Sequence, residues 1–248
     1  MTLSDYLTLL FLATLRTNMT TMTNERKKFP IELEALSELE FGLDEIVAAQ
    51  IRAATPSEHP FLVHMLGVPG CGKSTVAQKL HSILGTRPGG TSSILGFDRV
   101  MMEIDGYQNL NLHTAFAKFE MPARKAGYAI LEGLIASKAS IVFDHGGSAP
   151  EHPSILKFAK ELFGYTTVVI NVQVNLEEAK RRIAIREKVE DRHTPAHYVD
   201  DRLVDIRNLI PSYFDQADAI FNFNNSSSEP NEILIEQFCN KVADFLVS

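Results

Sequence analysis

The sequence contains one run of residues whose types and spacing can bind phosphate. It reads Gly67-Val68-Pro69-Gly70-Cys71-Gly72-Lys73-Ser74-Thr75 and matches the pattern G-x-x-x-x-G-K-[ST] at every fixed position. Glycines let the backbone curl so that successive N–H groups point inward, and these donors attract anions together with the N-terminus of a following helix. Lys73 adds a positive charge near the β- and γ-phosphates, and the Ser74 hydroxyl can bind Mg²⁺.

The segments on either side support this interpretation. Residues 61–66 form an apolar run of strand length, and residues 76–84 carry apolar side chains at helical spacing. A strand, a glycine-rich loop and a helix in this order make the motif specific, and a chance glycine turn is the disfavoured alternative. We expect the nucleotide to contact Gly67, Gly70, Cys71, Gly72, Lys73, Ser74 and Thr75.

Two carboxylates follow predicted strands further along the chain. Asp98 comes after a strand predicted at 92–97, and Asp144 ends a strand predicted at 140–144. In open parallel sheets, ligands bind beyond the carboxyl ends of the strands. Asp98 is therefore a candidate base for an attacking hydroxyl, and Asp144 a candidate Mg²⁺ ligand, directly or through water. For both acids a helix cap remains the structural alternative, and for the neighbouring His145 a structural role is the simpler interpretation.

An arginine-bearing helix follows a β-branched strand predicted at 166–174. It carries Arg181, Arg182 and Arg186. Guanidinium groups can neutralise charge on a transferring phosphoryl group, so residues 181–195 are predicted to form a lid over the triphosphate. The alternative is a set of ion pairs with the glutamates four positions earlier. We expect Arg186 and Arg192 to contact phosphate.

The alternation of strands and helices predicts an α/β fold. We expect a doubly wound, mostly parallel sheet of about five strands with helices on both faces. Residues 59–248 are predicted to form this nucleotide-binding domain, and residues 1–58 an N-terminal extension with one helix at about 31–53 that packs on it. Pro122 is expected to split a helix at 114–137, and Pro211 to break one at 196–217. Arg124 and Lys125 could equally contact a second substrate or lie in solvent.

Composition narrows the class of protein. The 248 residues carry a formal charge of −7 and have a pI of about 5.6, which argues against a nucleic-acid-binding surface. There are two cysteines, one of them Cys71 in the phosphate loop, which favours a reducing, cytoplasmic location. The apolar stretch at 6–15 is too short to span a bilayer, so no membrane span is expected.

The order of these features resembles the zeta-toxin family of small P-loop kinases. The resemblance covers about residues 60–225. It includes the phosphate loop, Asp98 where the family keeps its catalytic base, Asp144 at the Walker-B-like position, and the arginine-bearing helix where the family has its lid. The resemblance implies ATP and Mg²⁺ as cofactors and phosphoryl transfer to a hydroxyl. The family's acceptor is the sugar 3'-hydroxyl of UDP-N-acetylglucosamine.

The chain departs from the family pattern after the third strand. There the family carries a Glu-Gly-x-Gly-Arg type run, and this chain reads Asp144-His145-Gly146-Gly147-Ser148, without an arginine. The missing arginine argues against a nucleotide-sugar acceptor more than it argues against phosphoryl transfer. We expect an ATP- and Mg²⁺-dependent kinase for a small-molecule hydroxyl, with Lys73, Asp98, Arg186 and Arg192 as its catalytic residues.

Two other classes of protein stay open. The first is an ATPase switch, and the lack of an Asn-Lys-x-Asp motif disfavours GTP as its nucleotide. The second is a non-catalytic ATP-binding module that acts through a protein partner. The resemblance also raises an antitoxin-like partner, for which the chain itself offers no sign. Oligomeric state cannot be predicted from these features.

Overall fold

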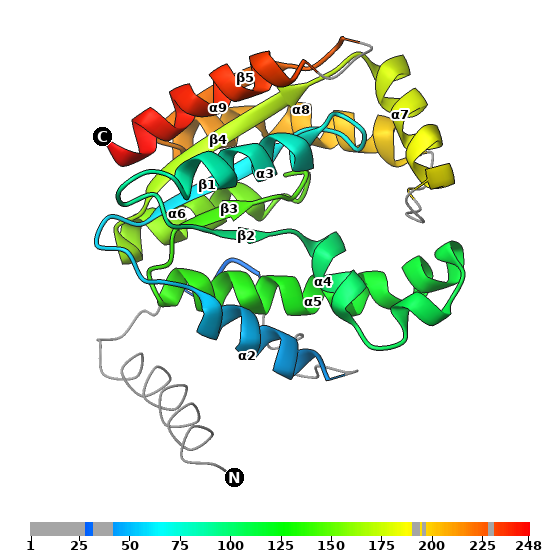
Figure 1. The fold of residues 1–248 in the computed structure, drawn as a ribbon, viewed down its shortest axis with the longest axis horizontal. Coiled ribbons are helices and arrows are strands. Elements are labelled where there is room, and N and C mark those ends of the chain that lie inside the picture. Colours follow the sequence, from blue (N-terminus) through cyan, green and yellow to red (C-terminus); the bar gives the residue numbers. More distant parts are fainter. Residues whose placement is uncertain (1–27, 32–41, 190–193, 195–196, 228–230) are drawn as a thin grey trace.

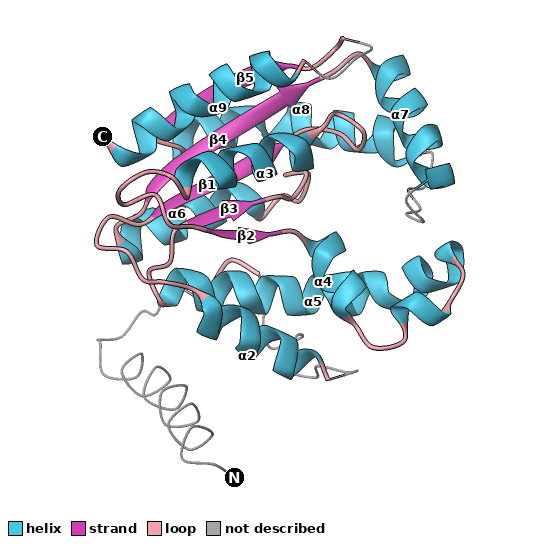
Figure 2. Ribbon diagram, viewed as in Figure 1, coloured by secondary structure: helices cyan, strands magenta, loops and turns pink. Residues whose placement is uncertain are grey.

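The protein is built on one five-stranded parallel sheet (Figure 2). The computed structural model describes residues 28–31, 42–189, 194, 197–227 and 231–248. The strands lie in the spatial order β2-β3-β1-β4-β5, and every pair is parallel. Their bounds are β1 Phe61–Leu66, β2 Ser93–Leu95, β3 Ile141–Phe143, β4 Thr166–Gln173 and β5 Ala219–Asn224.

Helices cover both faces of this sheet, as predicted. Right-handed crossovers place α3, which follows β1, on one face of the sheet. They place α6, which follows β3, on the other face. Accordingly α3 packs against α9, whereas α6 packs against α5 and α8 (Figure 1). The larger helices are α3 Lys73–Leu84, α5 Leu112–Ala136, α6 His152–Phe163, α7 Leu176–Val189, α8 Tyr198–Gln216 and α9 Glu232–Val247. Two short elements, α4 Phe97–Glu103 and η2 Tyr107–Asn109, lie between β2 and α5.

The strand order fixes where a ligand can bind. The chain leaves β1 toward β2, but it leaves the adjacent strand β3 in the opposite direction, toward β4. Such a switch point opens a crevice beyond the carboxyl ends of the two strands. The phosphate loop follows β1 and Asp144 follows β3, so both reach this crevice.

The central strand is buried along its whole length. All six residues of β1 are buried, and β4 is buried at its middle positions. Parallel strands covered on both faces have this continuous apolar pattern. The long β-branched strand β4 lies beside the central strand β1, with β5 at its other side.

Three helices differ from the sequence-based prediction. Helix α5 continues through Pro122 and α8 continues through Pro211, so neither proline splits its helix. Tertiary packing stabilises both helices despite the missing N–H groups. Of the helix predicted at 31–53, the structure gives α2, Leu43–Ala53; Ile31 is not helical, and residues 32–41 lie outside the described residues.

Helix α2 packs on the nucleotide-binding fold through α5. Gly133 of α5 leaves room for Ile51, because a Cβ there would lie 2.2 Å from the Ile51 Cδ1 atom. The Gln50 amide also donates to the Glu103 carboxylate of α4 at 3.3 Å. The boundary between an extension and a kinase domain near residue 58 stays a prediction. Among the described residues, no helix is long and apolar enough to cross a membrane.

A cluster of buried histidines lies behind the switch point. His64 of β1 stacks on Phe143 at 4.9 Å between ring centroids and meets His152 edge-on at 5.2 Å. Burial lowers the pKa of His64 to about 3, and its Nε2 is buried without a hydrogen-bond partner among the described residues. The His152 Nε2 is 2.8 Å from the Tyr128 hydroxyl.

We predict that His64→Leu makes the free energy of unfolding depend less steeply on pH at acid pH. His64 is neutral in the folded protein down to about pH 3, but the unfolded chain protonates it below about pH 6.5. Stability is therefore lost as pH falls through this window, by about 1.4 kcal/mol per pH unit for one proton. Urea unfolding between pH 4 and 6 should show a slope smaller by that amount in the variant.

The matched control is His59→Gln, at an exposed position before β1. Its slope is expected to follow the parent protein. Parallel stability curves for His64→Leu and the parent would show that His64 does not stay neutral in the folded state.

Candidate active site

The phosphate loop is held open by three glycines in the left-handed region. Gly67, Gly70 and Gly72 have φ values of 146°, 79° and 94°. A Cβ on Gly67 would lie 2.5 Å from the Val172 carbonyl oxygen, and one on Gly70 would lie 2.4 Å from that of Ala179. A side chain fits at neither position. The backbone of the loop therefore packs tightly on β4 and α7.

Lys73 lies at the start of α3, directly after Gly72. Its ammonium donates to the carbonyls of Gly67 at 2.8 Å and Val68 at 2.9 Å, and it lies 3.7 Å from the Cys71 sulfur. The positive charge is thus held across the mouth of the loop, where a phosphate group can replace the carbonyls as its partner. Both cysteines, Cys71 and Cys239, are buried free thiols.

The loop is tied to the far end of the sheet by Asn225. This residue directly follows β5, and its side-chain amide donates to the Cys71 carbonyl at 2.8 Å. The same amide nitrogen lies 2.4 Å from the position that a Cβ on Gly72 would occupy. Asn225 therefore makes a hydrogen bond that holds the loop and also forbids a side chain at Gly72.

Asp144 and Ser74 lie together at the carboxyl ends of β3 and the loop. The Ser74 hydroxyl donates to the Asp144 carboxylate. Burial raises the pKa of Asp144, while this hydrogen bond and the charges of Lys73 and Arg99 act in the opposite direction. A hydroxyl beside a buried carboxylate suits Mg²⁺, which takes few protein ligands and keeps several water or phosphate oxygens. No cluster of three or more His, Cys, Asp or Glu side chains that could hold a metal occurs among the described residues.

Asp98 lies in the first turn of α4, next to Asp144. The strands β2 and β3 pair with Leu95 opposite Phe143, so the residues that follow them lie side by side. A Cβ on Gly96 would lie 3.7 Å from the Asp144 Oδ2 atom. The N-cap of α4 is Gly96, so the capping role considered for Asp98 is wrong. Its carboxylate instead lines the cavity.

The arginines of α7 divide between two kinds of contact. Glu178 accepts from Arg181 at 2.8 Å and from Arg182 at 2.7 Å, and hydrogen bonds from these two lower its pKa to about 2. The Arg182 guanidinium also donates to the carbonyls of Asn225 at 3.0 Å and Ser227 at 2.6 Å. The alternative interpretation is confirmed for the Glu178–Arg182 pair, whereas Arg181 pairs with Glu178, three positions earlier, and not with Glu177 as expected. Arg182 in addition fastens α7 to the loop after β5.

Arg186 lies one turn further along α7 and lines the cavity. Its Nη2 atom donates to the Thr194 hydroxyl at 2.5 Å, so the helix contacts the segment that follows it. Of the lid predicted at 181–195, the structure describes residues 181–189 and 194. Arg192 lies outside the described residues.

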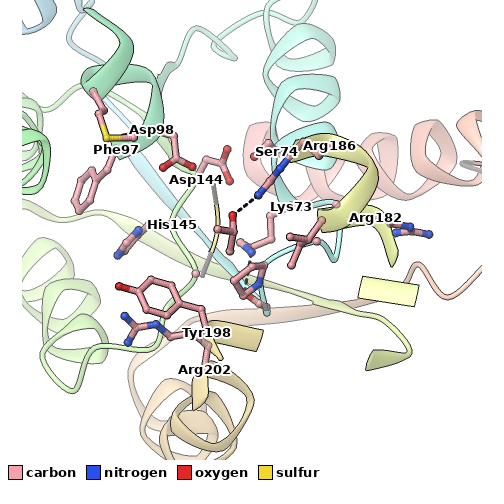
Figure 3. Close-up of a pocket in the computed structure, with 18 of the residues that line it drawn as sticks. Lys73, Ser74, Phe97, Asp98, Asp144, His145, Arg182, Arg186, Tyr198 and Arg202 are labelled. Atoms are coloured by element: carbon pink, nitrogen blue, oxygen red, sulfur yellow. Dashed lines mark hydrogen bonds between the residues drawn. The ribbon is translucent and has the colours of Figure 1, made fainter. Parts of the chain in front are cut away.

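These groups surround one cavity of about 710 Å³ (Figure 3). Of the predicted site residues that the structure describes, all but Cys71 line it: Gly67, Gly70, Gly72, Lys73, Ser74, Thr75, Asp98, Asp144 and Arg186. Figure 3 shows Ser74, Arg182 and Arg186 on one side of the cavity. Phe97, His145, Tyr198 and Arg202 gather on the other. The cavity therefore extends well beyond the phosphate loop.

Sequence reasoning misses several residues of this second side. Arg124, which the sequence leaves open, lines the cavity, whereas Lys125 does not. Tyr198 and Arg202 carry no sequence signal, because the face that α8 turns to the cavity depends on packing. Asn225 could have been found, since it follows a strand directly, as Asp144 does.

The sheet order and the loop after β1 define a P-loop nucleotide-binding fold. The profile of the family described as Zeta toxin matches residues 44–245. The chain therefore belongs to the zeta toxin family, as the resemblance predicted. Family and fold together support a nucleotide-dependent phosphotransferase. No curated protein matches the sequence.

Similarity to solved structures is limited to the fold. One comes from a characterisation of the PezAT chromosomal toxin-antitoxin system of Streptococcus pneumoniae. It is 14% identical with a TM-score of 0.57, over 85% of this chain and 95% of that one. A shikimate kinase from Acinetobacter baumannii in complex with shikimate is 18% identical with a TM-score of 0.48, over 77% of this chain and 94% of the other.

We predict that Asn225→Ala loosens the phosphate loop. The substitution leaves the buried Cys71 carbonyl without its amide donor, which costs about 1–3 kcal/mol. Urea unfolding should report this loss of stability, and titration with Mg·ATP should show affinity weakened several-fold. The control is Asn222→Ala, which removes an exposed amide of β5 that accepts from Asn171. Equal effects of the two substitutions would show that the bond to Cys71 does not stabilise the loop.

Proposed function

We propose that the protein is an ATP- and Mg²⁺-dependent kinase that transfers a phosphoryl group to a hydroxyl of a small molecule. One observation carries this proposal. The phosphate loop, the Ser74–Asp144 pair, Asp98 and Arg186 all line a single cavity, and that cavity continues past them. An attacking water molecule does not need this additional space. The additional space therefore favours a kinase over an ATPase switch. A binding module would not need an acid at the Asp98 position.

The nucleotide end of the cavity is assigned to the loop and α3. The backbone N–H groups after Gly67 and the N-terminus of α3 bind the β- and γ-phosphates, and Lys73 exchanges its carbonyl partners for phosphate oxygens. Ser74 and Asp144 hold Mg²⁺, which neutralises charge on the phosphates when it is bound. These roles use the geometry that the glycines and Asn225 maintain.

The acceptor end of the cavity is assigned to Asp98. Its carboxylate accepts the proton from the acceptor hydroxyl as the oxygen attacks. Arg186, on the opposite side, stabilises the negative charge of the transferring group through its guanidinium. Ser148 lines the cavity within the 144–148 run, where the family pattern carries an arginine. A nucleotide sugar is therefore one acceptor to test among several.

We predict that Lys73→Ala and Asp98→Asn fail in different ways. Lys73→Ala should lose both Mg·ATP binding and turnover, because the charge over the phosphates is gone. Asp98→Asn should bind Mg·ATP normally but release ADP at least about 100-fold more slowly, because the base is missing. The measurement is ADP release from Mg·ATP with and without a panel of nucleotide sugars, nucleosides and small alcohols.

Glu103→Gln is the matched control for Asp98. It removes a carboxylate from the same helix, at a position that faces Gln50 of α2 rather than the cavity. Full acceptor-dependent activity in Asp98→Asn would disprove the base assignment. ADP release by the parent protein that no acceptor stimulates would favour an ATPase.

A further inference from the structure

The cavity carries two arginines that neither take part in the proposed phosphoryl transfer nor fasten α7 to the loop after β5. Lys73, Arg182 and Arg186 belong to the loop and to α7. The two others, Arg124 of α5 and Arg202 of α8, lie on helices that contribute nothing to the phosphate loop. We propose that Arg124 and Arg202 form an oxyanion-binding subsite for the acceptor, so that the acceptor is a hydroxylated molecule with a carboxylate or a phosphate group. The proposal rests on the proposed function for calling this ligand the acceptor.

Arg124 projects from the face of α5 that covers the acceptor end. Residues three and four apart share one face of a helix, and the two that follow Arg124 at this spacing are Gly127 and Tyr128. A Cβ on Gly127 would lie 2.2 Å from the Phe97 ring, and the Tyr128 ring meets Phe97 at 4.8 Å between centroids. Arg124 therefore lies one turn from the aromatic wall of the cavity.

Arg202 reaches the same region from α8. Its guanidinium lies 5.1 Å from the centroid of the Tyr198 ring, one turn earlier on the helix. Figure 3 shows Arg202 and Tyr198 on the side of the cavity that holds Phe97 and His145. The charges of Arg124 and Arg202 both lower the pKa values of His145 and His152, after burial, which is the larger cause. Both arginines therefore line the cavity within electrostatic range of His145 and His152.

Within the described part of the chain, each of these guanidinium groups has only a distant carboxylate partner. Arg124 has Glu120 as an ion-pair partner, at 3.8 Å, and Arg202 has Asp205, at 3.5 Å. Both separations exceed the length of a good charge-assisted hydrogen bond. A guanidinium has five N–H donors in a planar fork that matches a carboxylate or a phosphate. Each side chain therefore retains donors for a ligand.

The other side chains that line the cavity indicate which further chemical groups the ligand carries. The chain as a whole carries a charge of −7, yet the described residues that line the cavity include five arginines and lysines against three carboxylates. Glu120 can accept from a hydroxyl of the ligand, and Asp98 accepts from the reacting one. Phe97, Met101 and Phe116 supply an apolar wall. A compact, polyhydroxylated anion fits this combination of groups.

The test measures binding without turnover. Full-length protein is saturated with Mg·AMP-PNP, a non-hydrolysed ATP analogue, so that the phosphate loop is occupied. Calorimetric titrations then use gluconate, glucose 6-phosphate, neutral glucose and UDP-N-acetylglucosamine. The variants are Arg124→Gln, Arg202→Gln, the double variant and Arg202→Lys, with Arg207→Gln on an exposed position of α8 as the control.

We expect saturable binding of gluconate or glucose 6-phosphate and none of glucose. Binding of one anion alone would identify its group, carboxylate or phosphate monoester, as the one recognised. Each glutamine substitution should weaken this binding roughly tenfold or more, and the double variant should abolish it. Arg202→Lys should retain part of it, because the charge remains. Arg207→Gln should match the parent, and all variants should bind Mg·AMP-PNP.

Three results would overturn the subsite. Glucose binding as tightly as the anions would remove the role of charge. Undiminished binding of any of the anions, UDP-N-acetylglucosamine included, to the double variant would show that Arg124 and Arg202 do not bind the anionic group. Absence of binding by every anion would leave the two arginines without a ligand of this class. Because no step requires phosphoryl transfer, a protein that proves not to be a kinase can still pass or fail this test.

Discussion

The whole site depends on a backbone that tolerates no Cβ atoms. Gly67, Gly70 and Gly72 press against Val172, Ala179 and Asn225, so three separate elements meet one short loop. This close packing fixes the direction of the loop N–H groups before any anion arrives. Preorganised donors of this kind bind charge without the reorganisation that water requires. The positions of Lys73, Ser74 and the α3 N-terminus then follow from the same loop.

Much of this arrangement could be read from the sequence because it depends on local rules. Strand, glycine loop and helix follow one another in the chain, and strand ends meet at one edge of a parallel sheet. These two rules suffice to find Lys73, Ser74, Asp98 and Asp144. The rule on proline failed at Pro122 and Pro211, since burial of the helix faces outweighs a single lost hydrogen bond. Arg202 and Tyr198 depend on how α8 lies across the sheet, and no local pattern encodes that.

The charged side chains that line the cavity are mainly positive, although the chain as a whole is acidic. An acidic chain repels anions in general, but a cleft with buried walls concentrates the field of the few cations inside it. Burial keeps His145 and His152 neutral, so the positive charge comes from groups that never titrate near neutral pH. The cavity lining is therefore more positive than the chain as a whole.

The link between Asn225 and Cys71 has a consequence for biosynthesis. The two residues are separated by 154 positions, so the loop near residue 70 gains its amide donor only after residue 225 has been synthesised and has folded back onto it. Helix α9 lies later still in the chain; it packs on α3 through Lys79–Glu236 and on the turn after α3 through Arg87–Asn240. Contacts this distant in sequence form slowly, because a long segment must be ordered first. A chain that stops before residue 225 therefore has a phosphate loop without this amide donor.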